Sequence, residues 1–442
     1  MLRRLSRHPH APIFRDHSGP SLTTGDLALV RSYMYSQAGA EPEIRPFAGR
    51  PAWLEPWLEM VLHDVPFYRA QNYSAKDFAA IQPVRRSDLH ADITRFVPDS
   101  QSLEGLILFS SSGTSGVPLA VPSHPRVAAL YLHYHTRALL RAGVELSGGA
   151  DTVAVALVGC QKHTFTYASV LPLLDEAGLV KLNLAPSHWK HPDDRVRYLD
   201  DIQPQLISGD PVSLAALAEL PLAHRPRALL STAMALSPAF RSALEARFGC
   251  PVVDVYSMTE AGPIATWSPR HEGFLLLQNR LFVEILDSSG RPVPEGGRGE
   301  ITLTGGFNSW LPLIRYRTGD YAALRMSPEG PVLTGLEGRP PVRFRGADGT
   351  MHNNIDVSHA LAHLALSRYA LHQDRRGSFT LSLPARDPGI EQAACASLEQ
   401  LLGRGIKIRL RTITAEDKVI QYTSDLKQDV IHWTAGKSLK ER

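Results

Sequence analysis

The sequence has little cysteine and no long apolar run. Only three cysteines occur in 442 residues, and Cys160, Cys250 and Cys395 lie far apart without the short spacing of metal or redox motifs. Neither a disulfide framework nor a structural zinc site is therefore expected. No stretch approaches the roughly 18 apolar residues that a membrane-spanning helix needs, and the basic start lacks the apolar segment of a signal peptide. We expect a cytoplasmic protein without a membrane partner.

An excess of charge of one sign is also missing. The chain has 47 Lys and Arg against 44 Asp and Glu, which gives a formal net charge of only +3. Because the basic residues are scattered among acidic ones, no nucleic-acid partner is expected. Hydrophobic residues make up 43% of the chain, which is enough apolar material for a large core and for two or three domains.

The middle of the chain alternates short apolar runs with helical patterns. This alternation indicates β–α–β units around a mostly parallel sheet, and therefore an α/β fold. The predicted strands are 152–159, 205–208, 228–231 and 252–256, and the predicted helices are 126–142, 167–177, 194–202, 211–220 and 238–248.

The pattern changes after about residue 274. Short strands separated by turn signals are predicted at 281–286, 299–304, 313–316 and 321–325, which favours an antiparallel, β-barrel-like part. A final segment follows the Pro340-Pro341 doublet and has strand and helix patterns of its own. We therefore expect a large N-terminal domain, residues 1–337, and a small α+β C-terminal domain, residues 338–442.

A run of small hydroxyl and glycine residues follows a predicted strand at Leu106–Phe109. Between such a strand and a helix, backbone N–H groups and hydroxyl groups can surround phosphate oxygens. The loop lacks the Gly-Lys-Ser/Thr of a Walker A motif, and a flexible linker is the alternative interpretation. The candidate phosphate-binding residues are Ser111, Ser112, Gly113, Thr114, Ser115 and Gly116.

A second candidate segment, Tyr256-Ser257-Met258-Thr259-Glu260, directly follows the apolar strand residues 252–255. Ligands bind at the carboxyl edge of parallel strands, where a tyrosine ring can stack on a base and a glutamate can hold Mg²⁺. Without that context Glu260 is only a carboxylate at a helix start.

The third segment is Tyr316-Arg317-Thr318-Gly319-Asp320. It places a carboxylate after a tight turn, where it can accept hydrogen bonds from two ribose hydroxyls. The alternative is an ordinary aspartate of a turn.

These three segments, in this order, resemble the adenylate-forming (ANL) superfamily, and within it the phenylacetate–CoA ligase-like branch. One upstream motif, Val65-Pro66-Phe67-Tyr68-Arg69 followed by Ile81 to Leu89, is similar to the opening of that branch. Ser208 to Leu214 is similar to the segment that precedes its nucleotide strand. Each motif is weak singly, but five in the right order are specific.

The resemblance implies roles for individual residues. Ser111 to Gly116 would cover the ATP phosphates, and Tyr256 and Ser257 would lie at adenine, with Ala233 in the stretch beside it. The other implied roles are Thr259 near the α-phosphate, Glu260 on Mg²⁺, Asp320 on the ribose, Arg339 on the nucleotide and Lys418 between the acid and the α-phosphate.

The resemblance also implies the reaction. A small carboxylic acid, which could be aromatic if His163, Phe165 and Tyr167 line its pocket, would be activated by ATP and Mg²⁺ as an acyl-adenylate with release of pyrophosphate. The acceptor would be CoA, as is most frequent in the branch. For assembly, a homodimer is an open expectation.

Three departures from the family pattern keep other interpretations open. Val117 replaces a lysine, Pro340-Pro341 stands where a hinge aspartate is usual, and Ser231 to Ala235 lacks the usual glycines and acid. One alternative is transfer of the activated group to an amine, another small nucleophile or a carrier protein. A second is a nucleotide-binding homologue without catalysis.

Overall fold

The computed structural model describes two compact units, each assembled from separate parts of the chain. One contains Met1–Ser36, Ala128–Ser257 and Arg343–Leu426, and the other contains Gln37–Val127 and Met258–Val342. The described residues are 1–15, 21–37, 49–111, 119–160, 164–338, 342–366, 368–384, 387–413 and 420–426.

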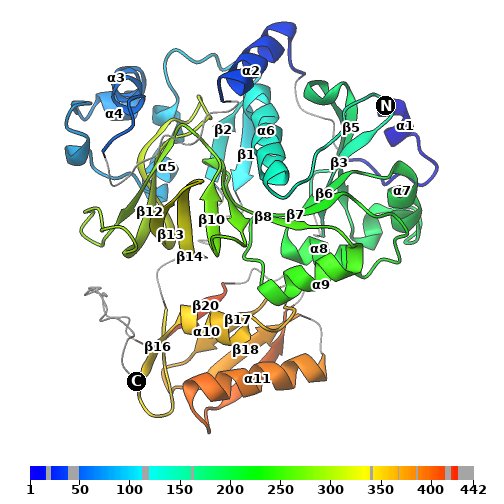
Figure 1. Cartoon of the computed structure of the whole chain (residues 1–442), viewed down its shortest axis with the longest axis vertical. Coiled ribbons are helices and arrows are strands. Elements are labelled where there is room, and N and C mark those ends of the chain that lie inside the picture. Colours follow the sequence, from blue (N-terminus) through cyan, green and yellow to red (C-terminus); the bar gives the residue numbers. More distant parts are fainter. Residues whose placement is uncertain are drawn as a thin grey trace. The chain divides into compact units, whose positions relative to one another are not determined.

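The first unit has a mostly parallel sheet, as the alternating pattern predicts. Its strand order is β4-β5-β3-β6-β7-β8, in which only β4 runs antiparallel to its neighbour. Helices α8 and α9 lie side by side, and α8 packs on β3 and β6 (Figure 1). The elements are α1 (Leu2–Ser6), α2 (Thr24–Gln37), α6 (Pro125–Arg141), β3 (Val153–Gly159), β4 (Tyr167–Leu171), η3 (Pro172–Leu174), β5 (Ala177–Asn183), η4 (Pro186–His188), α7 (Asp194–Ile202), β6 (Leu206–Gly209), α8 (Pro211–Ala218), β7 (Ala228–Ser231), α9 (Pro238–Phe248) and β8 (Val252–Met258).

Local sequence sets where two of these helices begin. Asp210 and Ser237 are N-caps, whose side chains accept hydrogen bonds from the backbone N–H of Ser213 and Phe240, respectively. Each cap is followed by proline, which suits the first helical position because that N–H has no partner within the helix. The predicted helices at 211–220 and 238–248 are therefore confirmed, the first ending two residues earlier.

The predicted helix at 167–177 is wrong. Tyr167–Leu171 is strand β4, and the chain then turns into β5 through Asp175 and Glu176, both of which have positive φ. Pro172 lies in the middle of the predicted helix, where it would remove a backbone donor and clash with the preceding turn. The apolar spacing alone was misleading.

The second unit contains an open antiparallel sheet and not a barrel. Its strand order is β11-β12-β13-β14-β10-β9, and within the described residues β11 and β9 do not pair. The barrel-like expectation is therefore corrected. The elements are α3 (Leu54–Asp64), α4 (Pro66–Arg69), η1 (Phe78–Ala80), α5 (Arg86–Ala91), η2 (Ile93–Phe96), β1 (Ile107–Ser111), β2 (Leu119–Ser123), β9 (Gly262–Ser268), β10 (Gly273–Leu276), β11 (Leu281–Leu286), β12 (Arg298–Gly305), β13 (Leu313–Ser327) and β14 (Gly330–Gly338).

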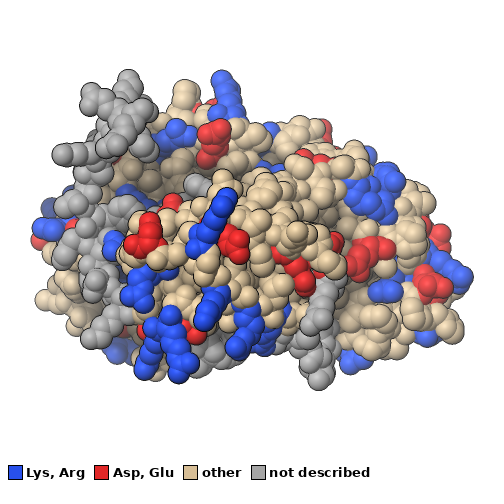
Figure 2. Space-filling model, turned by 90° about the horizontal axis from the view of Figure 1, so that it is seen from below, with Lys and Arg blue, Asp and Glu red and all other residues tan. Residues whose placement is uncertain are grey.

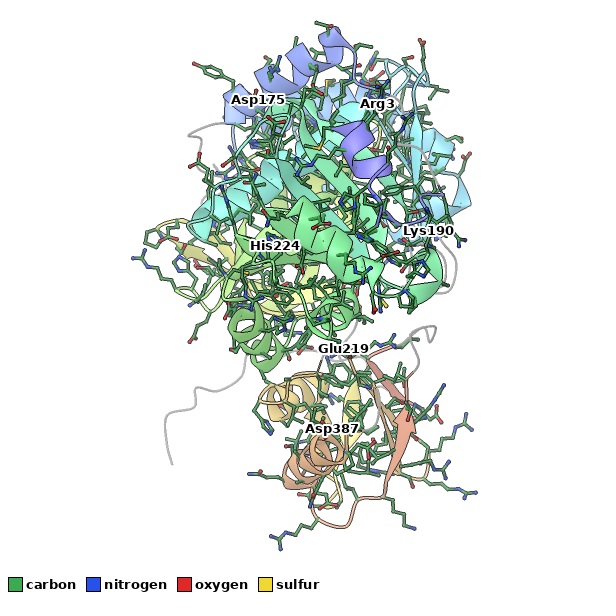
Figure 3. The ribbon with its side chains drawn as sticks, turned by 90° about the vertical axis from the view of Figure 1, so that its right-hand side faces the viewer. Arg3, Asp175, Lys190, Glu219, His224 and Asp387 are labelled. Carbon is green, nitrogen blue, oxygen red and sulfur yellow. The ribbon has the colours of Figure 1, made fainter. Side chains whose placement is uncertain are left out.

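The C-terminal segment forms a mixed four-stranded sheet with the order β19-β18-β17-β20. Helices α10 and α11 lie side by side on one side of this sheet, and Asp387 caps the start of α11 (Figure 3). The α+β character predicted for this part is confirmed. Its elements are β15 (Arg343–Arg345), β16 (Met351–Asn353), α10 (Asn354–Leu361), β17 (Ala370–Gln373), β18 (Phe379–Leu383), α11 (Pro388–Leu402), β19 (Ile408–Thr412) and β20 (Tyr422–Ser424).

Two kinds of feature are absent from the residues described above, membrane-spanning helices and three-ligand metal clusters. No helix there is both long and apolar enough to cross a bilayer. No three His, Cys, Asp or Glu side chains there gather as a metal site. Figure 2 shows one face of the molecule, on which basic and acidic side chains are both present.

Candidate functional site

Glu260 is a buried carboxylate at the connection between β8 and β9. Its exposed fraction is only 3%. Its Oε1 accepts a hydrogen bond from Arg86 Nη1 at 2.6 Å and another from the Tyr316 hydroxyl at 3.2 Å. Burial, with the neighbouring Glu260 charge, raises the pKa of Tyr316, so this hydroxyl stays protonated and donates. Within the described residues, both donors therefore use Oε1.

Backbone pairing brings Arg86 to this carboxylate. Val84 forms a parallel bridge with Tyr316, in which Val84 N donates to Arg315 O and Arg317 N donates to Val84 O. Arg86, two residues later, is the first residue of helix α5. The upstream segment that carries part of the family resemblance is thereby attached to β13, the strand that also carries Tyr316 and Asp320.

Asp320 lies inside a bulged strand rather than after a turn between two strands. The predicted strands 313–316 and 321–325 are parts of the single strand β13. Its pairing with β12 shifts between Arg317 and Tyr321, and Gly319 in this bulge has a φ of +81°, a conformation that favours glycine. Asp320 pairs directly with Gly338 of β14. The ribose candidate therefore lies beside the residue that precedes Arg339.

A buried ion pair fixes this bulge. Glu300 Oε2 accepts from Arg317 Nε at 2.5 Å, and Glu300 Oε1 accepts from Gly319 N at 3.0 Å. Glu300 is 3% exposed and Arg317 is 7% exposed.

Removing the Glu300 carboxylate should destabilise the second unit. Glu300→Ala leaves the Arg317 guanidinium buried without its counter-ion, so we expect the free energy of unfolding to fall by about 3–5 kcal/mol. Urea unfolding measures this change. The matched control is Glu104→Ala, at an exposed glutamate, which should change stability by less than about 0.5 kcal/mol. Equal stability of the two variants would contradict the role of Glu300.

In the first unit, two candidate nucleotide-binding segments lie at the carboxyl ends of the neighbouring parallel strands β7 and β8. Ser231 of β7 pairs with Asp254 of β8, so Ala233 and Tyr256 follow the same edge of the sheet. Ala233 has a φ of +69°, and Met234 N donates to Thr232 O at 2.9 Å across it. A γ-turn with positive φ at a non-glycine residue is rare and strained, and such strain concentrates at functional sites.

Asp254 is buried beneath this edge and paired with Arg241, whose Nη2 lies 3.1 Å from Asp254 Oδ2. Burial raises the pKa of Asp254 to about 7, although the Arg241 guanidinium opposes the shift. The pKa of an aspartate in an unfolded chain is about 3.9.

Asp254 should therefore make stability fall with rising pH. Between about pH 4 and pH 7 the folded chain holds a proton that the unfolded chain has released, so the free energy of unfolding decreases as pH rises. Asp254→Asn should remove a decline of up to about 1.4 kcal/mol per pH unit, measured by urea unfolding across this range. The control Asp193→Asn, at an exposed aspartate, should keep the decline. An unchanged slope in Asp254→Asn would contradict this assignment.

The candidate acid-pocket residues have different environments. Phe165 is 59% exposed, whereas Tyr167 at the start of β4 is partly buried, and burial raises the pKa of its hydroxyl. Ser111 ends β1. Other candidates lie outside the described residues: Ser112, Gly113, Thr114, Ser115, Gly116, His163, Arg339 and Lys418.

Sequence reasoning assigned no role to two residues of the site, Arg86 and Tyr316. Both stand within segments that carry the family resemblance, Ile81 to Leu89 and Tyr316 to Asp320. Those segments were the available signal, but the contact of each residue with Glu260 emerges only in the fold.

Comparison with known proteins places these observations in a family. Residues 66–309, more than half of the chain, match the AMP-binding enzyme family. A phenylacetate–coenzyme A ligase of Aromatoleum evansii is 33% identical over 90 residues, 20% of each chain. One of Pseudomonas putida is 27% identical over 143 residues, 30% of this chain and 33% of the relative. The matched segments thus span only a fifth and a third of these relatives.

Solved structures resemble most of the fold. A 2-hydroxyisobutyryl-CoA ligase, in the postadenylation state with an acyl-AMP, has a TM-score of 0.61 at 18% identity and covers 84% of this chain and 88% of its own. An anthranilate CoA ligase in complex with anthranoyl-AMP has a TM-score of 0.50 at 16% identity. The match covers 73% of this chain and 66% of the ligase chain. At such identities the likeness concerns the fold alone. The family match over more than half of the chain shows that the chain belongs to the AMP-binding enzyme family of the adenylate-forming superfamily.

Proposed function

We propose that this protein is an ATP-dependent acid–CoA ligase that activates a small carboxylic acid as its acyl-adenylate. The observation that carries the proposal is the buried Glu260 carboxylate, which accepts hydrogen bonds from Arg86 and Tyr316. Glu260 and Arg86 both lie inside the region that matches the AMP-binding family. Its position directly after β8 is where an α/β sheet presents groups to a ligand.

The donor set at Glu260 fits a single Mg²⁺ ligand. Mg²⁺ is commonly held by one or two carboxylates together with substrate phosphates and water. Glu260 offers one carboxylate with hard oxygen atoms, and the described residues supply no cluster of three ligands around it. When bound, Mg²⁺ would neutralise charge on the phosphates as pyrophosphate leaves.

The remaining residues would bind and align the two anionic reactants. Tyr256 stacks on adenine, Asp320 accepts hydrogen bonds from the ribose, and the hydroxyl loop Ser111 to Gly116 donates to the phosphates. A carboxylate oxygen of the acid then bonds to the α-phosphorus, and the bond from this phosphorus to the bridging oxygen of pyrophosphate breaks. Since both reactants are negative, Lys418 and Arg339 would supply the opposing charge.

In the second half-reaction the CoA thiolate would attack the acyl carbon, and AMP would leave. We propose that residues 338–442 act as the small mobile domain that rearranges between the two steps. His163, Phe165 and Tyr167 would line the acid pocket.

A panel of aliphatic and aromatic carboxylic acids, assayed for ATP–pyrophosphate exchange, tests the proposal. We expect exchange that depends on one class of acid, and an acyl-CoA product when CoA is added. Exchange without a thioester would instead favour an amine or a carrier protein as acceptor. Absence of exchange with every acid, while ATP still binds, would support the non-catalytic alternative.

A further inference from the structure

Arg86 already neutralises the carboxylate that the proposed reaction needs. The side chain of Glu260 is 3% exposed, whereas that of Arg86 is 26% exposed. The guanidinium therefore reaches a buried anion from the edge of the site. Tyr316 donates to the same oxygen, so the chain's own groups satisfy the negative charge of Glu260.

Arg86 and a divalent cation would consequently compete for the Glu260 carboxylate. A guanidinium at hydrogen-bond distance cancels much of the attraction that Glu260 offers to a second cation and repels that cation directly. Arg86 stands at the first position of the six-residue helix α5, and its partly exposed side chain has a solvent-facing side toward which it can turn.

We propose that Arg86 is a positioning residue that occupies Glu260 in the ligand-free protein and yields it to the divalent cation that arrives with the nucleotide. This inference rests on the proposed function. Replacement of Arg86 by the cation keeps the buried Glu260 carboxylate neutralised at every stage. It also makes the metal alone bind weakly, since only the additional phosphate contacts offset the loss of the Arg86 pair.

Titration with Mn²⁺ alone, followed by electron paramagnetic resonance, tests whether Arg86 and the cation compete for Glu260. Arg86→Gln removes the competing charge, so we expect Mn²⁺ to bind at least about tenfold more tightly than to the unsubstituted protein. Arg86→Lys keeps a cation and should bind Mn²⁺ nearly as the unsubstituted protein does. The double variant Arg86→Gln/Glu260→Gln should lose the gain. Equal affinity in Arg86→Gln, or a gain that persists in the double variant, would overturn the proposal.

A crystal of the unsubstituted protein soaked with Mn²⁺ and inorganic pyrophosphate provides a second measurement, independent of whether Arg86→Gln folds. The anomalous signal of Mn²⁺ should lie on Glu260, with Arg86 Nη1 beyond hydrogen-bond distance of Oε1. A metal on Glu260 with the ion pair intact would overturn the proposal. So would a Glu260 that remains without metal at saturating Mn²⁺.

Neither measurement uses the acid substrate. Competition for Mn²⁺ with no acid-dependent exchange would therefore contradict only the proposed function. Acid-dependent exchange with no competition would contradict only the role of Arg86.

Discussion

Replacing Glu260 by glutamine should lower acid-dependent ATP–pyrophosphate exchange by at least about 100-fold. The amide keeps the size of the side chain but removes the negative charge that would hold Mg²⁺. It also removes the counter-ion of Arg86, which lies 2.6 Å from the carboxylate. The exchange rate at saturating acid and ATP measures the effect.

The matched control is Glu284→Gln. Glu284 is also a buried glutamate paired with an arginine, since its Oε1 and Oε2 accept from Arg315 Nη2 and Nε, each at 3.3 Å. It has no proposed contact with the nucleotide. Provided that both variants are folded by circular dichroism, Glu284→Gln should retain most of the exchange activity. Undiminished exchange in Glu260→Gln would remove the role assigned to this residue.

Replacing Lys418 by alanine should slow formation of the acyl-adenylate by about 100- to 1,000-fold while ATP binding changes little. Lys418 stands in the sequence between β19 and β20, in a segment outside the described residues. Its proposed task is to bridge the acid and the α-phosphate, so its charge matters most when the new bond forms. Rapid-quench kinetics measures the adenylation rate, and calorimetry measures ATP affinity.

Lys407→Ala and Lys427→Ala are the controls, because these two lysines are the nearest alternatives in the same part of the chain. We expect both to leave the adenylation rate within a few-fold of the unsubstituted value. A normal rate in Lys418→Ala together with a slow rate in either control would move the catalytic role to that lysine.

Local sequence predicted the elements that have strong local signals. Strand β7 and helix α9 have the predicted bounds, and α9 begins at a serine cap followed by Pro238. The helix expected at 167–177 does not form because its apolar spacing also fits a strand and a turn, and because Pro172 disfavours a helix interior. The two short strands around Gly319 form one strand because a bulge, and not a turn, absorbs the extra residues.

The site was only partly predictable, because its central contacts join distant parts of the chain. Arg86 and Glu260 are 174 residues apart, and Tyr316 and Glu260 are 56 apart, so neither pairing follows from spacing. The strained turn at Ala233 was hidden because the segment has no glycine to signal a positive φ. By contrast, motifs predicted Glu260 and Asp320 as candidates. In the structure Tyr316 of β13 donates to Glu260, and Asp320 lies in β13 itself.

Identification of the products from ATP in a single turnover tests the central claim most directly. With a carboxylic acid from the active class, ATP labelled at the α-phosphate and no CoA, we predict that the label appears in an enzyme-bound acyl-AMP. One equivalent of pyrophosphate should form with it, and added CoA should convert the intermediate into AMP and a thioester. Formation of ADP and inorganic phosphate instead, or release of AMP without any acyl-AMP, would contradict the account.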